Sequence, residues 1–343
     1  FEVVLPCDPV DDVVVTFESD NTDEGQLRQS GGVGEVGAPP ADTPCTVTFT
    51  TSDWETVVEV EVEGVEDFVD DGDIDYEVTS TTASANVEFD GQSGPPVSVV
   101  NLDDDTAAVL LEPPSLAPVE LGGTRAITVK LATQPLAAVT VDLSSTTPSE
   151  GTVTPSVVLD TANWSFGVAA TVTAVNNHEY GANPEYRIQS STGSAASTDP
   201  VYNDLTGGEV VVQNVDDDKL LFIDPMGRAG NFGTVGTADG YCSAAAALLG
   251  VSGEYKAMIG AGGRTACGFL GCADDQFDWV FKPNVAYFRV GPGPTVGPRV
   301  GVANAEALFD FPLEASFGTG TYWTGMYENW QGMMFPCAAI GFE

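Results

Sequence analysis

The segment Val58-Glu59-Val60-Glu61-Val62-Glu63 alternates valine with glutamate. Successive side chains of a β-strand point to opposite faces, so this segment would carry its valines on one face and its glutamates on the other. The pattern predicts a strand that is buried on one side and solvated on the other. Residues 127–131 and 139–143 alternate in the same way, and Gly, Pro, Asn and Asp clusters separate such runs. Together these features predict an antiparallel β-sandwich.

The strand belongs to a unit that occurs twice. Residues 54–80 align without a gap with residues 164–190, at an offset of 110 positions. Both copies end in three aspartates, and each copy is about 110 residues long. Such self-similarity indicates tandem domains. We therefore expect a mainly β protein with sandwich domains at residues 1–105 and 106–218, followed by a different domain at residues 219–343.

The two copies differ at their beginnings. Residues 1–15 align with residues 127–141 at an offset of 126, so the first copy carries about sixteen extra residues around 20–44. It has nothing that corresponds to residues 106–126, and we expect it to lack its first strand. A sheet edge without its neighbour exposes unpaired N–H and C=O groups. Either an upstream segment fills the gap, or another subunit donates a strand there.

Charge is distributed unevenly along the chain, whose net charge is −40. Residues 1–105 have a net charge of −26, residues 106–218 of −10, and residues 219–343 of −4. This excess of acid excludes nucleic-acid binding, which requires a basic surface, and electrostatic docking on anionic membranes. No run of 18 apolar residues exists, so direct membrane insertion is not expected. Screening by a salty medium and neutralisation by bound cations both remain open.

Carboxylates gather at positions that suit Ca²⁺, which takes six to eight oxygen ligands. Five lie within nine residues around Gly72, and the corresponding loop of the second copy has lost most of them, so a site there should be weaker or lost. The aspartate triplets would lie at the two domain junctions. For each cluster the alternative is a solvated acidic loop. The candidate ligands are Asp67, Asp70, Asp71, Asp73, Asp75, Asp103, Asp104, Asp105, Asp216, Asp217 and Asp218.

The last 125 residues have a different composition, with nearly balanced charge and four of the six cysteines. Four consecutive alanines predict a helix that ends at Leu249, with Thr237 as its N-cap and Gly250 as its C-terminal stop. Even numbers of cysteines within separate domains predict disulfides formed in an oxidising compartment. Cys7 and Cys45 would pair in the first domain. Three pairings are open to the other four, which are Cys242, Cys267, Cys272 and Cys337.

Residues 1–218 resemble the Calx-beta and cadherin-like modules of bacterial surface proteins. The resemblance rests on the strand entries at Trp54 and Trp164, on the acidic hairpin and on the strand that closes each copy before Asp-Asp-Asp. It implies β-sandwiches that hold Ca²⁺ at their ends.

Residues 221–330 resemble a domain family of unknown function found at the C-termini of bacterial surface proteins. Five motifs occur in its order, among them Tyr255-Lys256-Ala257-Met258 and Asp278-Trp279-Val280-Phe281-Lys282-Pro283-Asn284. The family is similar to C-type-lectin-like folds, which implies a small α+β domain with disulfide-fixed loops. On that basis we favour a Cys267–Cys272 bond and a Cys242–Cys337 bond. Sugar binding is not implied, because Lys282 stands where the Ca²⁺-binding carboxylate of such lectins would be.

Catalysis has little support, because the chain has a single histidine, His178, and none of the common catalytic motifs. We therefore expect a secreted or cell-surface structural protein that is not an enzyme and that assembles with itself into a filament, sheath or surface layer. The alternative is an adhesin that binds glycans or other surface proteins through the third domain. Its candidate ligand surface consists of Trp279, Tyr287, Tyr322, Trp323, Tyr327 and Trp330.

Overall fold

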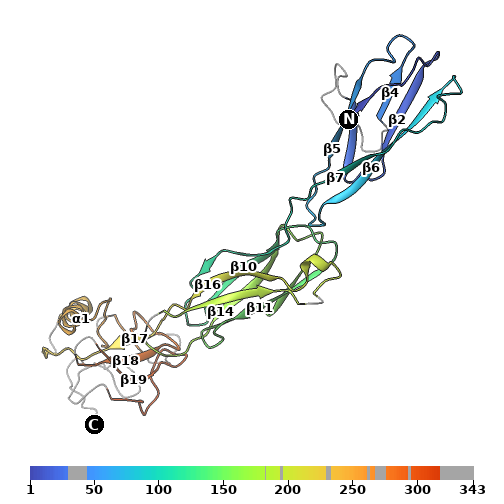
Figure 1. Ribbon diagram of the computed structural model, residues 1–343. Coiled ribbons are helices and arrows are strands. Elements are labelled where there is room, and N and C mark those ends of the chain that lie inside the picture. Colours follow the sequence, from blue (N-terminus) through green and yellow to red (C-terminus); the bar gives the residue numbers. More distant parts are fainter. Residues whose placement is uncertain are drawn as a thin grey trace.

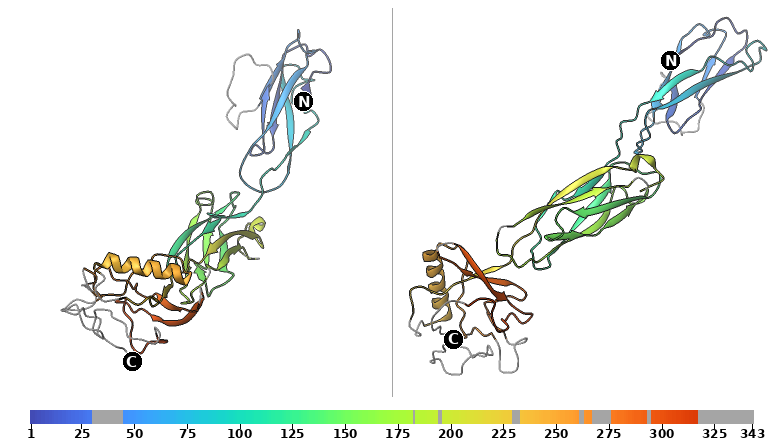
Figure 2. Two further views of the ribbon diagram at one scale, coloured as in Figure 1. Left: turned by 90° about the vertical axis from the view of Figure 1, so that its left-hand side faces the viewer. Right: turned by 60° about the horizontal axis from the view of Figure 1, so that its bottom comes forward.

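The computed structural model describes residues 1–29, 45–181, 183–193, 196–228, 233–260, 263–266, 276–292 and 295–316. These residues form mostly antiparallel sheets and a single α-helix, which confirms the predicted mainly β fold class. Three bodies follow one another in chain order and give an elongated molecule, with the N-terminal body at one end and the helix-containing body at the other (Figure 1). Two further views show the same succession (Figure 2).

The first body is a two-layer sandwich. One sheet has the strand order β4 (Cys45–Phe49), β2 (Val13–Ser19), β6 (Ile74–Ser84), β7 (Val97–Asn101), and the other has the order β1 (Glu2–Val3), β5 (Val58–Gly64), β3 (Gly25–Gln29). The strand expected from the valine–glutamate alternation is β5, in which Val60 is completely buried. Alternate residues of each strand enter the core, as the period of two requires.

The second body repeats this sandwich. Its sheets have the orders β12 (Gly151–Val153), β14 (Val168–Ala174), β10 (Thr124–Leu131), β8 (Val109–Glu112) and β13 (Ser156–Leu159), β11 (Val139–Ser145), β15 (Glu185–Ser191), β16 (Thr206–Gln213), β9 (Ser115–Leu116). A short 3-10 helix, η1 (Pro200–Tyr202), packs on one end. Tyr202 is fully buried there, and its hydroxyl bonds to both the backbone and the side chain of Thr133.

The two sandwiches differ along one side. In the second, β8 extends one sheet beyond β10 and β9 extends the other beyond β16, so residues 109–116 close the side where the two sheets meet. Among the described residues of the first sandwich, nothing occupies these two places beside β1 and β7. We call this side of the first sandwich, bounded by β1 and β7, the open seam.

The core beneath the open seam is less well covered. Val210 and Val212 of β16 are both 0% exposed. The corresponding residues of β7, Val97 and Val99, are only partly buried, although they pack against the core of the first sandwich. The difference follows from the positions of β8 and β9, because the two sandwiches are otherwise built from corresponding strands.

The third body combines a small sheet with the helix. β17 (Lys219–Leu221) pairs in parallel with β18 (Ala286–Val290), which pairs antiparallel with β19 (Val296–Val302). Helix α1 (Val235–Leu249) ends at Gly250 in the left-handed conformation, as predicted. The predicted N-cap was wrong: Thr234 caps the helix, and its side chain accepts a hydrogen bond from the Thr237 amide.

Candidate cation sites at the domain junctions

At the first junction, the loop between β5 and β6 lies against the chain that leaves β7. The Gly72 amide donates to Asp103 Oδ2 at 2.7 Å, and the Asp103 amide donates to Asp73 Oδ1 at 3.1 Å. Asp70 reaches into the second domain, where its Oδ2 accepts the Ala107 amide at 2.6 Å. Some of the predicted ligands therefore hold the junction together through backbone amides.

Carboxylates converge around this framework. Oxygens of Glu24, Asp67 and Asp71 lie within 4.8 Å of one another, and so do oxygens of a second triplet. The second triplet consists of Glu66, Asp104 and Asp105. Residues of both triplets line a pocket of about 100 Å³ that opens to solvent. Hard carboxylate oxygens in this number suit Ca²⁺ better than a transition metal, and the described part of the junction offers it no nitrogen or sulfur ligand.

The structure corrects part of the predicted ligand set. Of the five aspartates around Gly72, Asp67 and Asp71 belong to a converging triplet, whereas Asp70, Asp73 and Asp75 belong to neither triplet. Asp75 lies on β6 and faces solvent. Sequence reasoning missed Glu24 and Glu66.

A signal for Glu24 was present in the repeat, because Glu24 and Glu150 occupy corresponding positions. Asn101 donates to Glu24 at 2.9 Å and to the carbonyl of residue 65 at 3.0 Å. Asn214 makes the matching pair of bonds to Glu150 and to the carbonyl of residue 175. The repetition shows that an acid at this position is built into both sandwiches.

The first junction shows the electrostatic effect of crowded acids. Partial burial and the neighbouring charges of Glu24, Asp67 and Asp103 raise the pKa of Asp71. A cation placed among these groups would remove that repulsion.

The second junction repeats the framework of the first but buries its acids. The Gly181 amide donates to Asp216 Oδ2 at 2.9 Å, and the Asp216 amide donates to Asn183 Oδ1 at 3.0 Å. Asp218 Oδ1 accepts the amide of Ala286, the first residue of β18, at 2.9 Å. The junction thus joins the second sandwich to the sheet of the third body.

Buried oxygens at this junction lack hydrogen-bond partners. Asp217 is 8% exposed and Asp218 is 4% exposed. Both carboxylate oxygens of Asp217 and Oδ2 of Asp218 are buried with no hydrogen-bond partner among the described residues, and so is Nδ1 of His178. A buried charge without a partner is strongly unfavourable. The charge on these oxygens would therefore be neutralised either by a bound cation or by protonation.

Glu120, which the sequence analysis missed, belongs to the same cluster. It is 1% exposed, and its amide donates to the carbonyl of Val215, next to the aspartate triplet. Burial and, to a lesser extent, the charges of Asp216, Asp217 and Asp218 together raise its pKa to about 7, against the lowering effect of a bond from the Asn177 amide. Burial also raises the pKa values of Asp217 and Asp218. The prediction that a site at this end of the second copy would be weakened rested on the hairpin alone and did not include Glu120.

Equivalent hairpins contact the next domain at both junctions. Phe68 packs on Trp164 of the second sandwich with ring centroids 6.1 Å apart, and its carbonyl accepts the Gln134 amide. Tyr180 packs on Phe288 of the third body, also at 6.1 Å. The same part of each sandwich therefore combines an aromatic contact with the acidic cluster.

The described cysteines do not form the predicted disulfides. Cys7 is free and exposed, whereas Cys45 is free and buried. The reason lies in β4, where Cys45 points into the core together with Val47 and Phe49. Cys242 is also free, and its predicted partner Cys337 lies outside the described residues. The predicted Cys267–Cys272 pair lies wholly outside them.

The predicted aromatic ligand surface is wrong where the structure describes it. Trp279 and Tyr287 are 6% and 3% exposed and belong to the core of the third body, together with Phe281 and Phe309. Their rings pack edge-on against Phe281. Tyr322, Trp323, Tyr327 and Trp330 lie outside the described residues.

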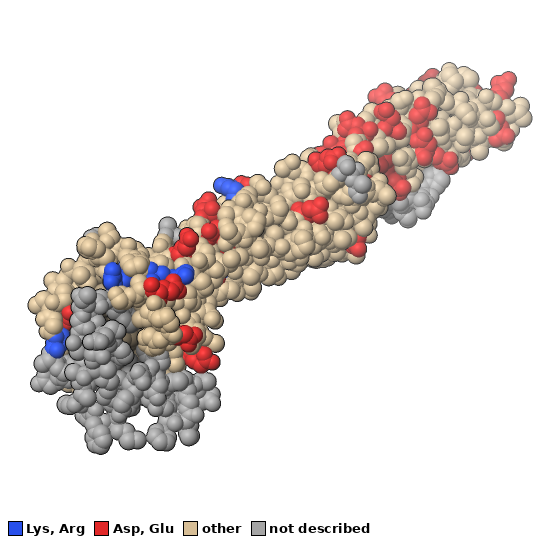
Figure 3. Space-filling view, turned by 90° about the horizontal axis from the view of Figure 1, so that it is seen from below, with Lys and Arg blue, Asp and Glu red and all other residues tan. Residues whose placement is uncertain are grey.

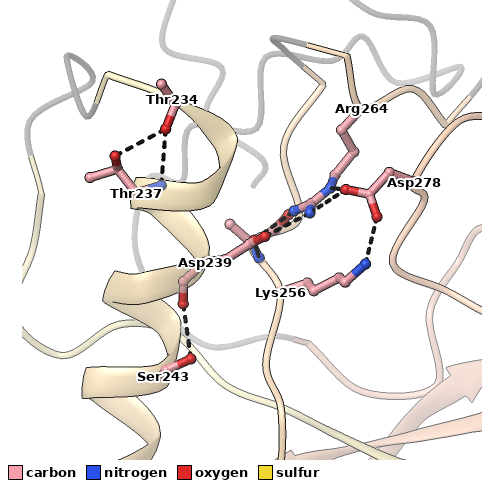
Figure 4. Close-up of polar contacts among 8 residues, drawn as sticks. Thr234, Thr237, Asp239, Ser243, Lys256, Arg264 and Asp278 are labelled. Atoms are coloured by element: carbon pink, nitrogen blue, oxygen red, sulfur yellow. Dashed lines mark hydrogen bonds and ion pairs between the residues drawn. The ribbon is translucent and has the colours of Figure 1, made fainter.

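A charged cluster in the third body is structural. Arg264 is 1% exposed and donates to Asp239 of α1, to Asp278 and to the carbonyl of Ala257 (Figure 4). Lys256 adds a second cation on Asp278 at 2.5 Å. These bonds lower the pKa of Asp278 to about 2, and the bond to Arg264 lowers that of Asp239. All three guanidinium nitrogens of Arg264 donate hydrogen bonds within the protein. The cluster therefore fixes α1 to the loops rather than offering a binding site.

Within the described part of the chain, no helix is both long enough and apolar enough to span a membrane. Residues 225–339 match the model of a family described as "Protein of unknown function (DUF1554)". This match agrees with the resemblance of the third domain to a family of unknown function. None of the curated proteins matches the chain.

Solved structures resemble the chain weakly. CBD12 from CALX1.2 is 12% identical over 62% of this chain and 92% of that chain, with a TM-score of 0.27. Domains 4 and 5 of the S-layer protein SbsC are 14% identical over 59% of this chain and 70% of that chain, with a TM-score of 0.22. Chicken VE-cadherin EC1-2 is 14% identical over 60% of this chain and 84% of that chain, with a TM-score of 0.25. Scores this low carry no argument about function. Nothing among these matches supports the C-type-lectin-like fold expected for the third domain.

Proposed function

We propose that the protein is a non-enzymatic, extracellular structural protein whose copies assemble into a filament, sheath or surface layer, with domain junctions stiffened by Ca²⁺. The observation that carries the assembly is the open seam. It presents two edge strands, β1 and β7, above partly exposed Val97 and Val99. Exposed edges of this kind are sites of strand addition, and the second sandwich closes the same place with its own strands.

Ca²⁺ stiffening is supported by the two acidic clusters. At the first junction, the oxygens of Glu24, Asp67 and Asp71 would hold the ion. At the second, the unpartnered oxygens of Asp217 and Asp218 would hold it beside Glu120. A bound cation would neutralise the repulsion among these acids and fix each hairpin against the next domain.

The assembly is tested by light scattering after gel filtration, over a range of concentrations, and by negative-stain imaging. We expect species larger than a monomer that grow with concentration. Val99→Asp, which places a charge in the open seam, should reduce them to monomers. Thr48→Asp should leave assembly unchanged, because Thr48 is exposed on β4, the opposite edge of the same sheet. Circular dichroism establishes that both variants remain folded.

A chain that stays monomeric at every concentration would refute the assembly and favour the adhesin. In that case, binding of the whole protein to a glycan array becomes the informative measurement. The described aromatics Trp279 and Tyr287 would not be its contact residues, because both are buried.

A further inference from the structure

We infer that the second sandwich and the third domain form one rigid unit, joined by a connecting chain that both bodies hold, and that the molecule bends at its first junction. This inference goes beyond the proposed function, because it concerns one chain and requires neither self-assembly nor a bound cation. It follows from three differences between the junctions: how the connecting chain is held, which contacts cross the junction, and where the charge lies.

At the second junction, both bodies hold the connecting chain. Val215 forms a β-bridge with Val119 of the second sandwich. Lys219 then begins β17, which pairs with β18 in the sheet of the third body, and Leu221 of β17 packs against the core of that body (Figure 1). Between these two attachments lie only residues 216–218, of which the last two are buried. A connection this short, paired at each end, leaves few backbone dihedral angles free to act as a hinge.

The first junction lacks such a strand in the described chain. Its connecting chain, residues 102–107, belongs to no strand, and none of these residues is buried. Leu102, which opens the segment, is 74% exposed. Hinges are typically a few residues of this kind, which absorb changes in φ and ψ without uncovering a core.

The contacts that cross the second junction converge on β18. Asp218 accepts the first amide of β18 at 2.9 Å, and Asn176 Nδ2 donates to the carbonyl of Asn284, just before that strand, at 3.1 Å. Tyr180 packs on Phe288 of the same strand. Since β18 also pairs with β17, a rotation of the third body would have to break these bonds together.

The hydrogen bonds and the ring contact that cross the first junction, among the described residues, come from one loop between β5 and β6. Phe68 packs on Trp164, and its carbonyl accepts the Gln134 amide at 2.6 Å. Asp70 accepts the Ala107 amide. Phe68 nevertheless remains 60% exposed. Relative motion is the default for domains that meet through contacts this limited, so movement of the loop can open the junction.

Charge also favours bending at the first junction. Residues 1–105 have a net charge of −26 and residues 219–343 of −4, and the space-filling view shows acidic residues spread over the first domain and basic residues on the third (Figure 3). At the second junction the third body contributes a cation, because Arg299 donates to the carbonyl of His178 at 3.4 Å. Repulsion among the carboxylates of the first junction would separate its loop from the connecting chain when no cation is bound.

Double electron–electron resonance measures both junctions in the whole protein. p-Acetylphenylalanine, which carries a nitroxide after coupling and leaves the cysteines untouched, replaces Val158 on β13 together with either Thr48 on β4 or Val296 on β19. All three positions are exposed. Dilution with unlabelled chain restricts the measurement to distances within one molecule. In chelator, we expect a narrow distance distribution for Val158 with Val296, and one at least about twice as wide for Thr48 with Val158.

Ca²⁺ separates this inference from the proposed function. Excess Ca²⁺ should narrow the distribution across the first junction and leave that across the second unchanged, because the protein alone already holds the second junction. If Ca²⁺ changes neither, stiffening of the first junction by Ca²⁺ fails, whereas the rigid unit stands. Distributions of equal width across the two junctions in chelator would overturn the inference.

Substitutions in β17 test whether this strand fixes the second junction. Leu221→Asp places a charge against the core of the third body, so it should release β17 and widen the distribution across the second junction. Lys219→Gln, at an exposed position of the same strand, should leave it narrow. Hydrogen exchange in α1 verifies that the third body stays folded. A folded Leu221→Asp protein with a narrow distribution would show that β17 does not fix the junction.

A matched pair of loop substitutions tests the same contrast without altering a core. Phe68→Ala removes the ring contact with Trp164 and should widen the distribution across the first junction, measured with Ca²⁺ present. Tyr180→Ala removes the equivalent contact with Phe288, but the distribution across the second junction should stay narrow, because β17 remains paired. Widening across the second junction in Tyr180→Ala would contradict the inference.

Discussion

At the residue scale, each sandwich contains a glycine that lies directly beneath a core tyrosine. A Cβ on Gly25 would lie 2.1 Å from Tyr76 Oη, and a Cβ on Gly151 would lie 1.9 Å from Tyr186 Oη. Both tyrosines are buried. The glycines thus provide the space that lets these rings enter the core.

Gly151→Ala should consequently destabilise the second sandwich by about 1–3 kcal/mol, because the ring must move out of a packed core. Gly193→Ala in the same domain is the matched control, since a Cβ there meets open space. We expect it to change stability by less than about 0.5 kcal/mol. Hydrogen exchange followed by mass spectrometry reports each domain separately. Equal exchange in the two variants would contradict this account of the packing.

Arg264 gives a second prediction at this scale. Its planar group bonds two carboxylates and a carbonyl while it is almost completely buried, and a lysine cannot reproduce that fork. Arg264→Lys should destabilise the third body by about 1–3 kcal/mol, because lysine leaves acceptors of this fork without their hydrogen bonds. The rate of backbone hydrogen exchange in α1, measured by mass spectrometry, should rise accordingly.

Arg299→Lys is the control for that substitution. Arg299 pairs with Glu314 at the surface, where an ion pair contributes about 0–1 kcal/mol. Its exchange pattern should match that of the parent. A similar loss of protection in both variants would show that the buried fork has no special importance.

At the element scale, the pleat of β4 determines the fate of its cysteine. Cys45 faces the core, and burial raises the pKa of its thiol, so little thiolate is available for reaction. Cys7 is exposed. Iodoacetamide should therefore alkylate Cys7 in the folded protein at least about tenfold faster than Cys45, as measured by mass spectrometry of the peptides.

Unfolding supplies the control for this experiment. In denaturant the two thiols should react at similar rates without any reducing agent. If neither cysteine reacts until a reductant is added, the two are joined by a disulfide, and the free-thiol arrangement is wrong.

At the scale of the whole molecule, the second junction should make stability depend on pH. Burial raises the pKa of Glu120 from 4.5 to about 7, so between these values the folded protein binds more protons than the unfolded chain. Stability in the presence of a chelator should therefore rise as the pH falls from about 7 to about 4.5. The measurement is the melting temperature at constant ionic strength.

Ca²⁺ should also stabilise the folded protein, but most strongly at high pH, where the acids of the junction are deprotonated. At 100 times its dissociation constant, an ion that binds only the folded state adds about 2.7 kcal/mol, and it should weaken or reverse the rise at low pH because protons compete with it. Asp217→Asn should stabilise the chelated protein and reduce its response to Ca²⁺. Asp75→Asn, on the solvent face of β6, should do neither. A melting temperature that ignores both Ca²⁺ and chelator would show that the clusters are merely solvated.

The sequence by itself determined what depends on local pattern. The alternation at Val58–Glu63 specified a strand with one buried face, and Gly250 specified the end of a helix, because period and backbone conformation are properties of neighbouring residues. The repeat added the correspondence between the two sandwiches. The segment-by-segment charge required only counting.

Only the tertiary structure decided which side chains meet. Glu120 joins Asp217 and Asp218 through an isolated β-bridge between Val119 and Val215, and Glu24 joins Asp67 where β3 begins beside the end of β5, so no spacing along the chain could reveal either group. Burial of Trp279 was likewise undecided, since an aromatic side chain suits a core as well as a surface. Long-range packing brings these residues together, and it also sets the desolvation that makes the acids of the second junction unusual.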